Sequence, residues 1–350
     1  MKQWINHFNV SRWVGVTLLC LGTLPLSLWA QSADELLEMH FHRGRQLLFS
    51  GESMEHAIED FSYVLSEDFL HFEARLFRAI AYFELGEIEL AKADALYARH
   101  LHEADARLNG VLGIIAMREG RYPQASDFFT RQMQLDPNNP QAYINRAWAL
   151  LMLPHYEELA LADYQQALER DPDNVTALFS QLEPLLRLGR TDEAHTEITR
   201  IIHLYPELTE LYAKRAQIRL LLGEEERALA DYQQVLRLIT ESEFDLMLHA
   251  MRGIASIYLS QENWQATLVY SQAVLTLTNE EDAEALVLQG RALLGIYQTT
   301  GEADIFSEAQ RLFLLAIERG FLNIVYLERL LHEANADYTV EFSLIEEVLE

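Results

Sequence analysis

The sequence predicts an all-α protein: a right-handed superhelical solenoid of about eight helix-turn-helix units, closed by a C-terminal capping helix. Three observations predict this fold class. Small residues recur at a nearly constant spacing, apolar residues follow each of them on one helical face, and a turn residue separates the two helices of a unit. Half of the 350 residues are hydrophobic, against 15 glycines and 8 prolines, which disfavours a disordered chain and a sheet-rich or glycine-rich scaffold.

The charge of the chain excludes one class of partner. Asp and Glu number 54 and Lys and Arg number 27, so the formal net charge is −27. A nucleic-acid-binding domain needs a basic face that replaces the counterions of the phosphates. We therefore expect no nucleic-acid partner, and an anionic membrane surface is also disfavoured. The single cysteine cannot form a bridge within the chain.

Residues 1–30 have the features of a secretory signal peptide. Lys2 and Arg12 are the only charged residues, an apolar block runs from Val14 to Leu24, and the segment ends at Ala30. We predict cleavage after Ala30 and export of the rest of the chain, which in a bacterium means the periplasm or cell envelope.

The alternative for this segment is an uncleaved N-terminal anchor. Trp13–Ala30 is 18 residues long, which is near the lower limit for crossing a bilayer. Glycines and Pro25 within it weaken that interpretation. In both cases the positive end stays in the cytoplasm and the remainder is exported.

The repeat is clearest in the second helix of each unit. A small residue is followed four and seven residues later by mostly apolar residues, which places all three on one helical face. The small residues are Ala57, Ala91, Ala125, Ala160, Ala194, Ala228, Ala266 and Ala309, at spacings of 34, 34, 35, 34, 34, 38 and 43.

A second series of mostly small residues lies upstream, in the first helix of each unit. A small residue lets the partner helix approach closely, and stacked hairpins bury the apolar face that one hairpin cannot cover alone. The series is Gly44, Ala79, Gly113, Ala147, Leu182, Ala216, Gly253 and Gly290, and the turns between the helices are at Gly51, Gly86, Gly120, Pro154, Gly189, Gly223, Gln261 and Gly301.

At these residues the sequence resembles the tetratricopeptide repeat family. PQAYINRAWALLMLPHYEELALADYQQALERDPDN, residues 140–174, is among the clearest units. The fifth unit departs from the pattern at bulky Leu182. The predicted organisation is a signal peptide at 1–30, a solenoid at 37–320 with units at about 37–71, 72–105, 106–139, 140–174, 175–208, 209–242, 247–282 and 283–320, and a capping helix with an acidic tail at 321–350.

The sequence contains no recognisable catalytic motif. H-E-x-x-H, G-x-S-x-G and a glycine-rich phosphate loop are all missing from it. His100 and His102 lie near acidic residues, and a weak zinc or copper site there is one alternative, but no ligand set has the spacing of a closed site. The loop at 136–140 lacks the spacing of a calcium loop. We therefore expect no catalytic residue, no metal, no cofactor and no enzyme activity.

The family resemblance implies a binding surface on the first helices. In such proteins these helices line the concave side, through residues three before, one after and four after the small residue. We expect a partner segment, an amphipathic helix or an extended apolar peptide, in this groove around Trp148. The alternative is that the same side chains pack between repeats. The groove residues predicted in this way are Leu76, Ile80, Phe83, Ile114, Met117, Ile144, Trp148, Leu151 and Phe179.

These features predict a non-enzymatic protein–protein interaction scaffold, or a client-binding adaptor, of the cell envelope. The alternative is an accessory or regulatory subunit of an envelope enzyme or of secretion or polysaccharide machinery. The expected partner is a protein or peptide. A second copy of the chain is a further candidate, because apolar residues of the C-terminal segment, such as Phe342 and Leu344, could form a homodimer.

Overall fold

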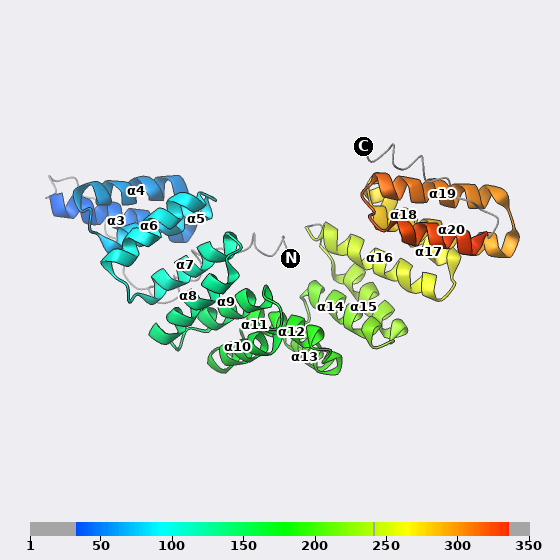
Figure 1. Cartoon of the computed structure of the whole chain (residues 1–350), viewed down its shortest axis with the longest axis horizontal. Coiled ribbons are helices and arrows are strands. Elements are labelled where there is room, and N and C mark those ends of the chain that lie inside the picture. The colour runs from blue at the N-terminus through cyan, green and yellow to red at the C-terminus, as the bar shows by residue number, and fades with distance from the viewer. Residues whose placement is uncertain (1–32, 241, 336–350) are drawn as a thin grey trace. The chain divides into compact units, whose positions relative to one another are not determined.

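The computed structural model describes residues 33–240 and 242–335. Within these ranges the regular elements are all α-helices. They form two compact blocks, an N-terminal block that ends at Gly189 and a C-terminal block that begins at Arg190 (Figure 1). The predicted signal peptide and most of the predicted acidic tail lie outside the described residues.

The N-terminal block is a stack of helix hairpins, as the repeat predicts. Each helix packs against the next one along the chain, both within a repeat and between repeats. Its helices are α3 (Ala33–Ser50), α4 (Met54–Glu67), α5 (Phe72–Glu84), α6 (Ile88–Leu101), α7 (Ala106–Arg118), α8 (Tyr122–Leu135), α9 (Pro140–Leu151), α10 (Glu157–Arg170), α11 (Val175–Ser180) and α12 (Leu182–Arg187).

The C-terminal block continues the pattern and ends in one extra helix. That helix, α20, packs on α18 and α19 through buried Leu327 and Leu331. Leu322 precedes the helix and is 92% exposed, so it takes no part in this packing. The helices are α13 (Thr191–Leu204), α14 (Thr209–Leu221), α15 (Glu225–Leu238), α16 (Phe244–Ser260), α17 (Trp264–Leu277), α18 (Ala283–Thr300), α19 (Ala303–Glu318) and α20 (Ile324–Ala334).

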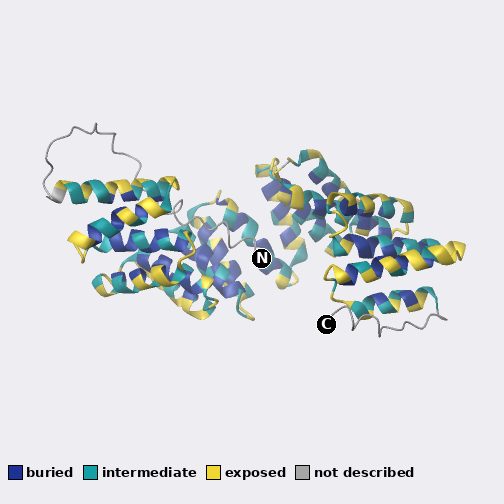
Figure 2. Cartoon of the chain, turned by 90° about the horizontal axis from the view of Figure 1, so that it is seen from above, coloured by how far each residue is buried: buried dark blue, intermediate teal, exposed yellow. Residues whose placement is uncertain are grey.

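Small residues allow the two helices of a repeat to touch. In the third repeat a Cβ atom added to Gly113 would overlap the ring of Phe129, and Gly290 stands in the same relation to Phe313. Buried residues are concentrated where neighbouring helices of a block face each other (Figure 2). The small residues Ala57, Ala91, Ala125, Ala160, Ala194, Ala228 and Ala309 are all fully buried.

The seventh repeat differs from the prediction by one residue. Ala266, expected in the core, is only partly buried, and the fully buried positions of α17 are Thr267, Ser271 and Val274. Asn263 sets this register, because its side chain accepts the backbone N–H of Ala266 and so fixes where the helix begins. The hydroxyl of Thr267 donates to the carbonyl of Asn263, and the hydroxyl of Ser271 donates to the carbonyl of Thr267.

The turns need one residue in the left-handed region of the backbone. Glycine adopts it freely, as at Gly51 and Gly120. The fourth repeat uses His155 at φ 67°, and the seventh uses Glu262 at φ 56°. Both residues lie one position after the predicted turn residues, Pro154 and Gln261.

The first helix of the fifth repeat is interrupted. It is divided into α11 and α12 at Gln181. Pro184 explains the break, because proline has no N–H to donate to the carbonyl four residues earlier, at Ser180, and its ring crowds that carbonyl. Leu182, which departs from the repeat pattern, is fully buried beside this break.

Candidate functional site

Five of the nine predicted groove residues belong to the core. Leu76 and Ile144 are fully buried, Ile80 is 1% exposed, Phe83 8% and Leu151 9%. Their side chains fill the space between neighbouring helices, as the alternative interpretation expects. The prediction that these five residues line an open groove is therefore corrected.

The other four predicted residues are partly exposed. We call Ile114 and Met117 of α7, Trp148 of α9 and Phe179 of α11 the first-helix surface, since they come from the first helices of three successive repeats. Ile114 and Met117 pack on a buried cluster that includes Ala149 of α9. The surface is therefore apolar and rests on a packed core.

Trp148 is held by packing and by a hydrogen bond. It packs on the core cluster of the fourth repeat, which contains Ile144 and Tyr164. Its indole Nε1 donates to Ser180 Oγ at 3.3 Å, which joins α9 to α11. Next to it, Arg187 Nη1 donates to the carbonyl of Leu151 at 2.8 Å. The indole is thus held in one orientation while part of it remains open to solvent.

A recurring ion pair stabilises four of the hairpins, and sequence reasoning missed it. An arginine just before the small residue of the first helix binds an aspartate of the second helix through both Nε and Nη2, the bidentate geometry that suits a carboxylate. The aspartate side chains are at most 8% exposed. The pairs are Arg43–Asp60, Arg78–Asp94, Arg146–Asp163 and Arg215–Asp231.

The pKa values of two of these aspartates are shifted in opposite directions. Burial raises the pKa of Asp60, but bonds from Arg43 and His40 outweigh it, so the pKa lies below its ordinary value. Asp163 has no such histidine, and burial outweighs the bonds from Arg146, so its pKa is raised. Both carboxylates are almost fully buried, at 3% and 4% exposure, and each holds the two helices of its repeat together.

Two further observations limit the chemistry. Within residues 33–240 and 242–335, no three His, Cys, Asp or Glu side chains gather closely enough to hold a metal ion. His102, one of the histidines weighed as a ligand, contacts the ring of Phe72 edge-on at 4.9 Å. Among the helices described, none has the length and apolar character needed to span a bilayer.

The architecture is that of a stacked-hairpin scaffold, in which the available sites are surfaces between neighbouring helices. The family model for the tetratricopeptide repeat matches residues 78–140, 111–175 and 158–206. Together with the architecture, this match shows that residues 78–206 are tetratricopeptide repeats, and the solved structures below share the fold over a larger part of the chain.

Curated relatives match the repeats over part of their length. The "DnaJ homolog subfamily C member 7 homolog" of Schizosaccharomyces pombe is 27% identical over 150 residues, covering 42% of this chain and 31% of the relative. The human mitochondrial import receptor subunit TOM70 is 27% identical over 173 residues, covering 46% of this chain and 27% of the relative. The match thus spans less than a third of the length of either relative.

Solved structures show the same fold at low identity. A tetratricopeptide repeat protein of Parabacteroides merdae has a TM-score of 0.54 at 16% identity and covers 86% of this chain and 99% of its own. The C-terminal part of a repeat protein of Cytophaga hutchinsonii has a TM-score of 0.57 at 16% identity and covers 70% of this chain and 98% of its own. PilW, a type IV pilus biogenesis factor, has a TM-score of 0.50 at 16% identity and covers 59% of this chain and 92% of its own.

Proposed function

We propose that the protein is an exported, non-enzymatic scaffold that binds a partner segment on its first-helix surface. The observation that carries this proposal is Trp148, a large aromatic side chain that is held in place and yet partly exposed. Tryptophan is enriched among the residues that dominate binding energy at protein interfaces. An oriented indole also loses little conformational freedom when a partner binds.

The form of the surface suggests the form of the partner. Ile114, Met117, Trp148 and Phe179 come from three neighbouring first helices, and packed helices lie about 10 Å apart. A strip of that length suits the apolar face of one short amphipathic helix, or an extended apolar peptide. The surface offers no group that would activate a nucleophile or hold a cofactor, so binding is the activity we propose.

Export supports a role in the cell envelope. Residues 1–30 have the charge, apolar core and small terminal residue of a signal peptide. One protein of similar fold, PilW, is a pilus biogenesis factor, and one relative is an import receptor subunit. We accordingly propose the periplasm or cell envelope as the site of action, with a mature chain that begins at Gln31.

The test compares two aromatic substitutions in the native host. Trp148→Ala removes the proposed anchor, and Tyr156→Ala removes a 44% exposed aromatic residue at the start of α10. After crosslinking outside the cytoplasm, we expect Trp148→Ala to recover at least tenfold less partner, while Tyr156→Ala recovers as much as the parent chain. A single partner recovered at near-equal amount indicates an accessory subunit, and many partners indicate an adaptor.

The proposal fails under two results. If the Trp148→Ala variant folds and still recovers every partner, the first-helix surface is not the binding site. A full-length chain in the cytoplasm that retains residues 1–30 removes the envelope assignment.

A further inference from the structure

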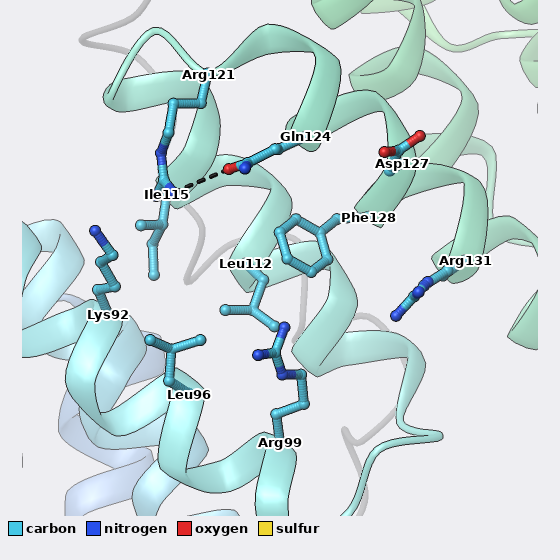
Figure 3. Close-up of a pocket in the computed structure, with 10 residues that line it drawn as sticks. All are labelled: Lys92, Leu96, Arg99, Leu112, Ile115, Arg121, Gln124, Asp127, Phe128 and Arg131. Atoms are coloured by element: carbon cyan, nitrogen blue, oxygen red, sulfur yellow. Dashed lines mark hydrogen bonds between the residues drawn. The ribbon is translucent and has the colours of Figure 1, made fainter.

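A pocket lies in the N-terminal block, between the second helices of the second and third repeats and apart from the first-helix surface. Helices α6 and α8 form its walls and α7 forms its floor (Figure 3). Its volume is about 350 Å³, enough for one or two side chains of a ligand. The lining residues are Lys92, Leu96, Arg99, Leu112, Ile115, Arg121, Gln124, Asp127, Phe128 and Arg131.

The corresponding place in the neighbouring repeats is filled by a polar triad. There the arginine of the recurring ion pair binds an aspartate of its own repeat and a hydroxyl on the second helix of the preceding repeat. Arg78 donates to Ser62 Oγ at 3.0 Å, and Arg146 donates to Thr130 Oγ1 at 3.1 Å. The two triads are Arg78–Asp94–Ser62 and Arg146–Asp163–Thr130.

In the third repeat all three triad positions are apolar. Leu112, directly before the small residue, occupies the position of the arginine. Phe128, directly before the aromatic residue of the second helix, occupies the position of the aspartate. Leu96 occupies the position of the hydroxyl residue. Leu112 is 4% exposed, while Phe128 and Leu96 remain partly open to solvent. The shorter Leu112 does not bridge the helices as the arginines do, and an apolar pocket is left in the place of the triad.

Basic side chains surround this apolar floor (Figure 3). The lining residues include four cations and one carboxylate, in a chain whose formal net charge is −27. Lys92 binds Glu119 at 2.6 Å, and Arg121 binds both Glu119 and Gln124, the latter at 2.9 Å. Arg99 and Arg131 make no hydrogen bond or ion pair with any residue the structure describes, so both guanidinium groups are available to a ligand.

We propose that this pocket binds an acidic segment of a partner protein, with one aromatic or aliphatic side chain seated on Leu112 and Phe128. Carboxylates on either side of that side chain would then meet Arg99 and Arg131, whose forked donors suit carboxylate geometry. A basic segment is repelled by the same groups. A long polyanion would meet the acidic surface beyond the pocket, which favours a short acidic stretch. The site lies on the second helices and does not depend on the proposed first-helix surface.

The experiment uses three labelled peptides and the mature full-length chain. The first is Glu-Glu-Phe-Glu-Glu, the second has Ser in place of Phe, and the third has Gln in place of every Glu. Binding is followed by fluorescence anisotropy at low and high salt. We expect saturable binding of the first peptide, at least tenfold tighter than that of the other two, and weaker at high salt because the contacts are ionic.

Three variants locate the binding site. Arg99→Gln with Arg131→Gln removes the unpaired cations and is expected to weaken the first peptide at least tenfold. Arg237→Gln removes an exposed arginine of α15 and is expected to change nothing. Leu112→Arg with Phe128→Asp restores the polar pair of the other repeats and is expected to abolish binding without lowering the melting temperature.

Several outcomes overturn the proposal. One is a failure of the first peptide to bind, and another is equal affinity for the first and third peptides. A third is unchanged binding of the first peptide by the Arg99→Gln/Arg131→Gln variant. This result overturns the proposal even if the Leu112→Arg/Phe128→Asp variant does not fold. A fourth is a parent chain that binds none of the three peptides but binds vesicles of anionic lipid, with that binding lost in the Arg99→Gln/Arg131→Gln variant. This result would assign the pocket to a membrane surface.

Discussion

Removing one carboxylate, by Asp163→Ala, measures what the recurring Arg–Asp pairs contribute to stability. The Asp163 side chain is 4% exposed and accepts bonds from Arg146 Nε at 2.7 Å and Nη2 at 2.6 Å. Without it, Arg146 keeps only the 3.1 Å bond to Thr130 Oγ1. Breaking a buried ion pair on one side costs about 3–5 kcal/mol. We expect about 3 kcal/mol, because the Arg146 side chain is 18% exposed and still reaches water.

The matched double variant copies the third repeat. Arg146→Leu with Asp163→Phe places in the fourth repeat the residues that Leu112 and Phe128 provide in the third. Apolar groups that replace a whole buried pair are often neutral or stabilising. Thr130 stays satisfied, because its hydroxyl donates to the carbonyl of Ser126 at 2.8 Å. The double variant is therefore expected within about 1 kcal/mol of the parent free energy of unfolding.

Denaturant unfolding followed by far-UV circular dichroism measures both values. Hydrogen exchange of peptides from α9 and α10 shows where stability is lost, since repeats can open separately. Glu197→Ala is the control, because its partner Arg200 is 48% exposed, and a surface pair of this kind contributes about 0–1 kcal/mol. The reasoning is refuted if Asp163→Ala costs no more than Glu197→Ala, or if the double variant loses as much as the single one.

Three further changes test other parts of the fold. Ala125→Leu overpacks a fully buried position and should cost about 1–3 kcal/mol in denaturant unfolding; an unchanged midpoint contradicts the register of the second helices. His155→Gly removes a side chain from a residue in the left-handed region, at φ 67°, and so relieves about 1–2 kcal/mol of backbone strain. This gain exceeds the conformational entropy that glycine costs, so the melting temperature should rise. A fall in melting temperature contradicts the left-handed conformation of this turn residue. Burial, with smaller effects of nearby charges, lowers the pKa of His249 below 6.5, so stability should rise as pH rises through the interval below 6.5. His249→Gln should flatten that rise in melting temperature, and a variant with the parent's pH profile contradicts the assignment.

The sequence predicts the fold well because each repeat must satisfy the same packing condition. The approach of Gly113 to Phe129 needs a small residue on one helix and a large one on the other, and both recur at a readable spacing. The exceptions follow from local chemistry that the spacing does not record. Asn263 sets the start of α17 by capping it, and Pro184 divides the first helix of the fifth repeat.

The candidate surface was harder to predict than the fold. The residues one and four places after the small residue lie near the boundary between the inter-helix core and the exposed face. Ile80 and Ile114 occupy equivalent positions, yet Ile80 is 1% exposed and Ile114 is only partly buried. Burial there depends on the neighbouring helices, which a spacing rule does not describe.

The recurring ion pairs were within reach of the sequence, by contrast. Arginine directly before the small residue and aspartate directly before the aromatic one appear in several repeats, as in Arg146 and Asp163. Aligning the repeats at these positions would also have identified Leu112 and Phe128 as the exception, and with them the place of the basic pocket.

Photo-crosslinking from defined positions tests most directly whether a partner lies on the first-helix surface. A photoreactive amino acid at Met117 of α7 is compared, in the native host, with the same amino acid at Leu159 of α10, which is 45% exposed. We predict that position 117 gives a discrete adduct outside the cytoplasm, that Trp148→Ala removes it, and that position 159 gives none. Adducts of equal yield at both positions, or an adduct at 117 that Trp148→Ala leaves unchanged, would contradict binding at this surface.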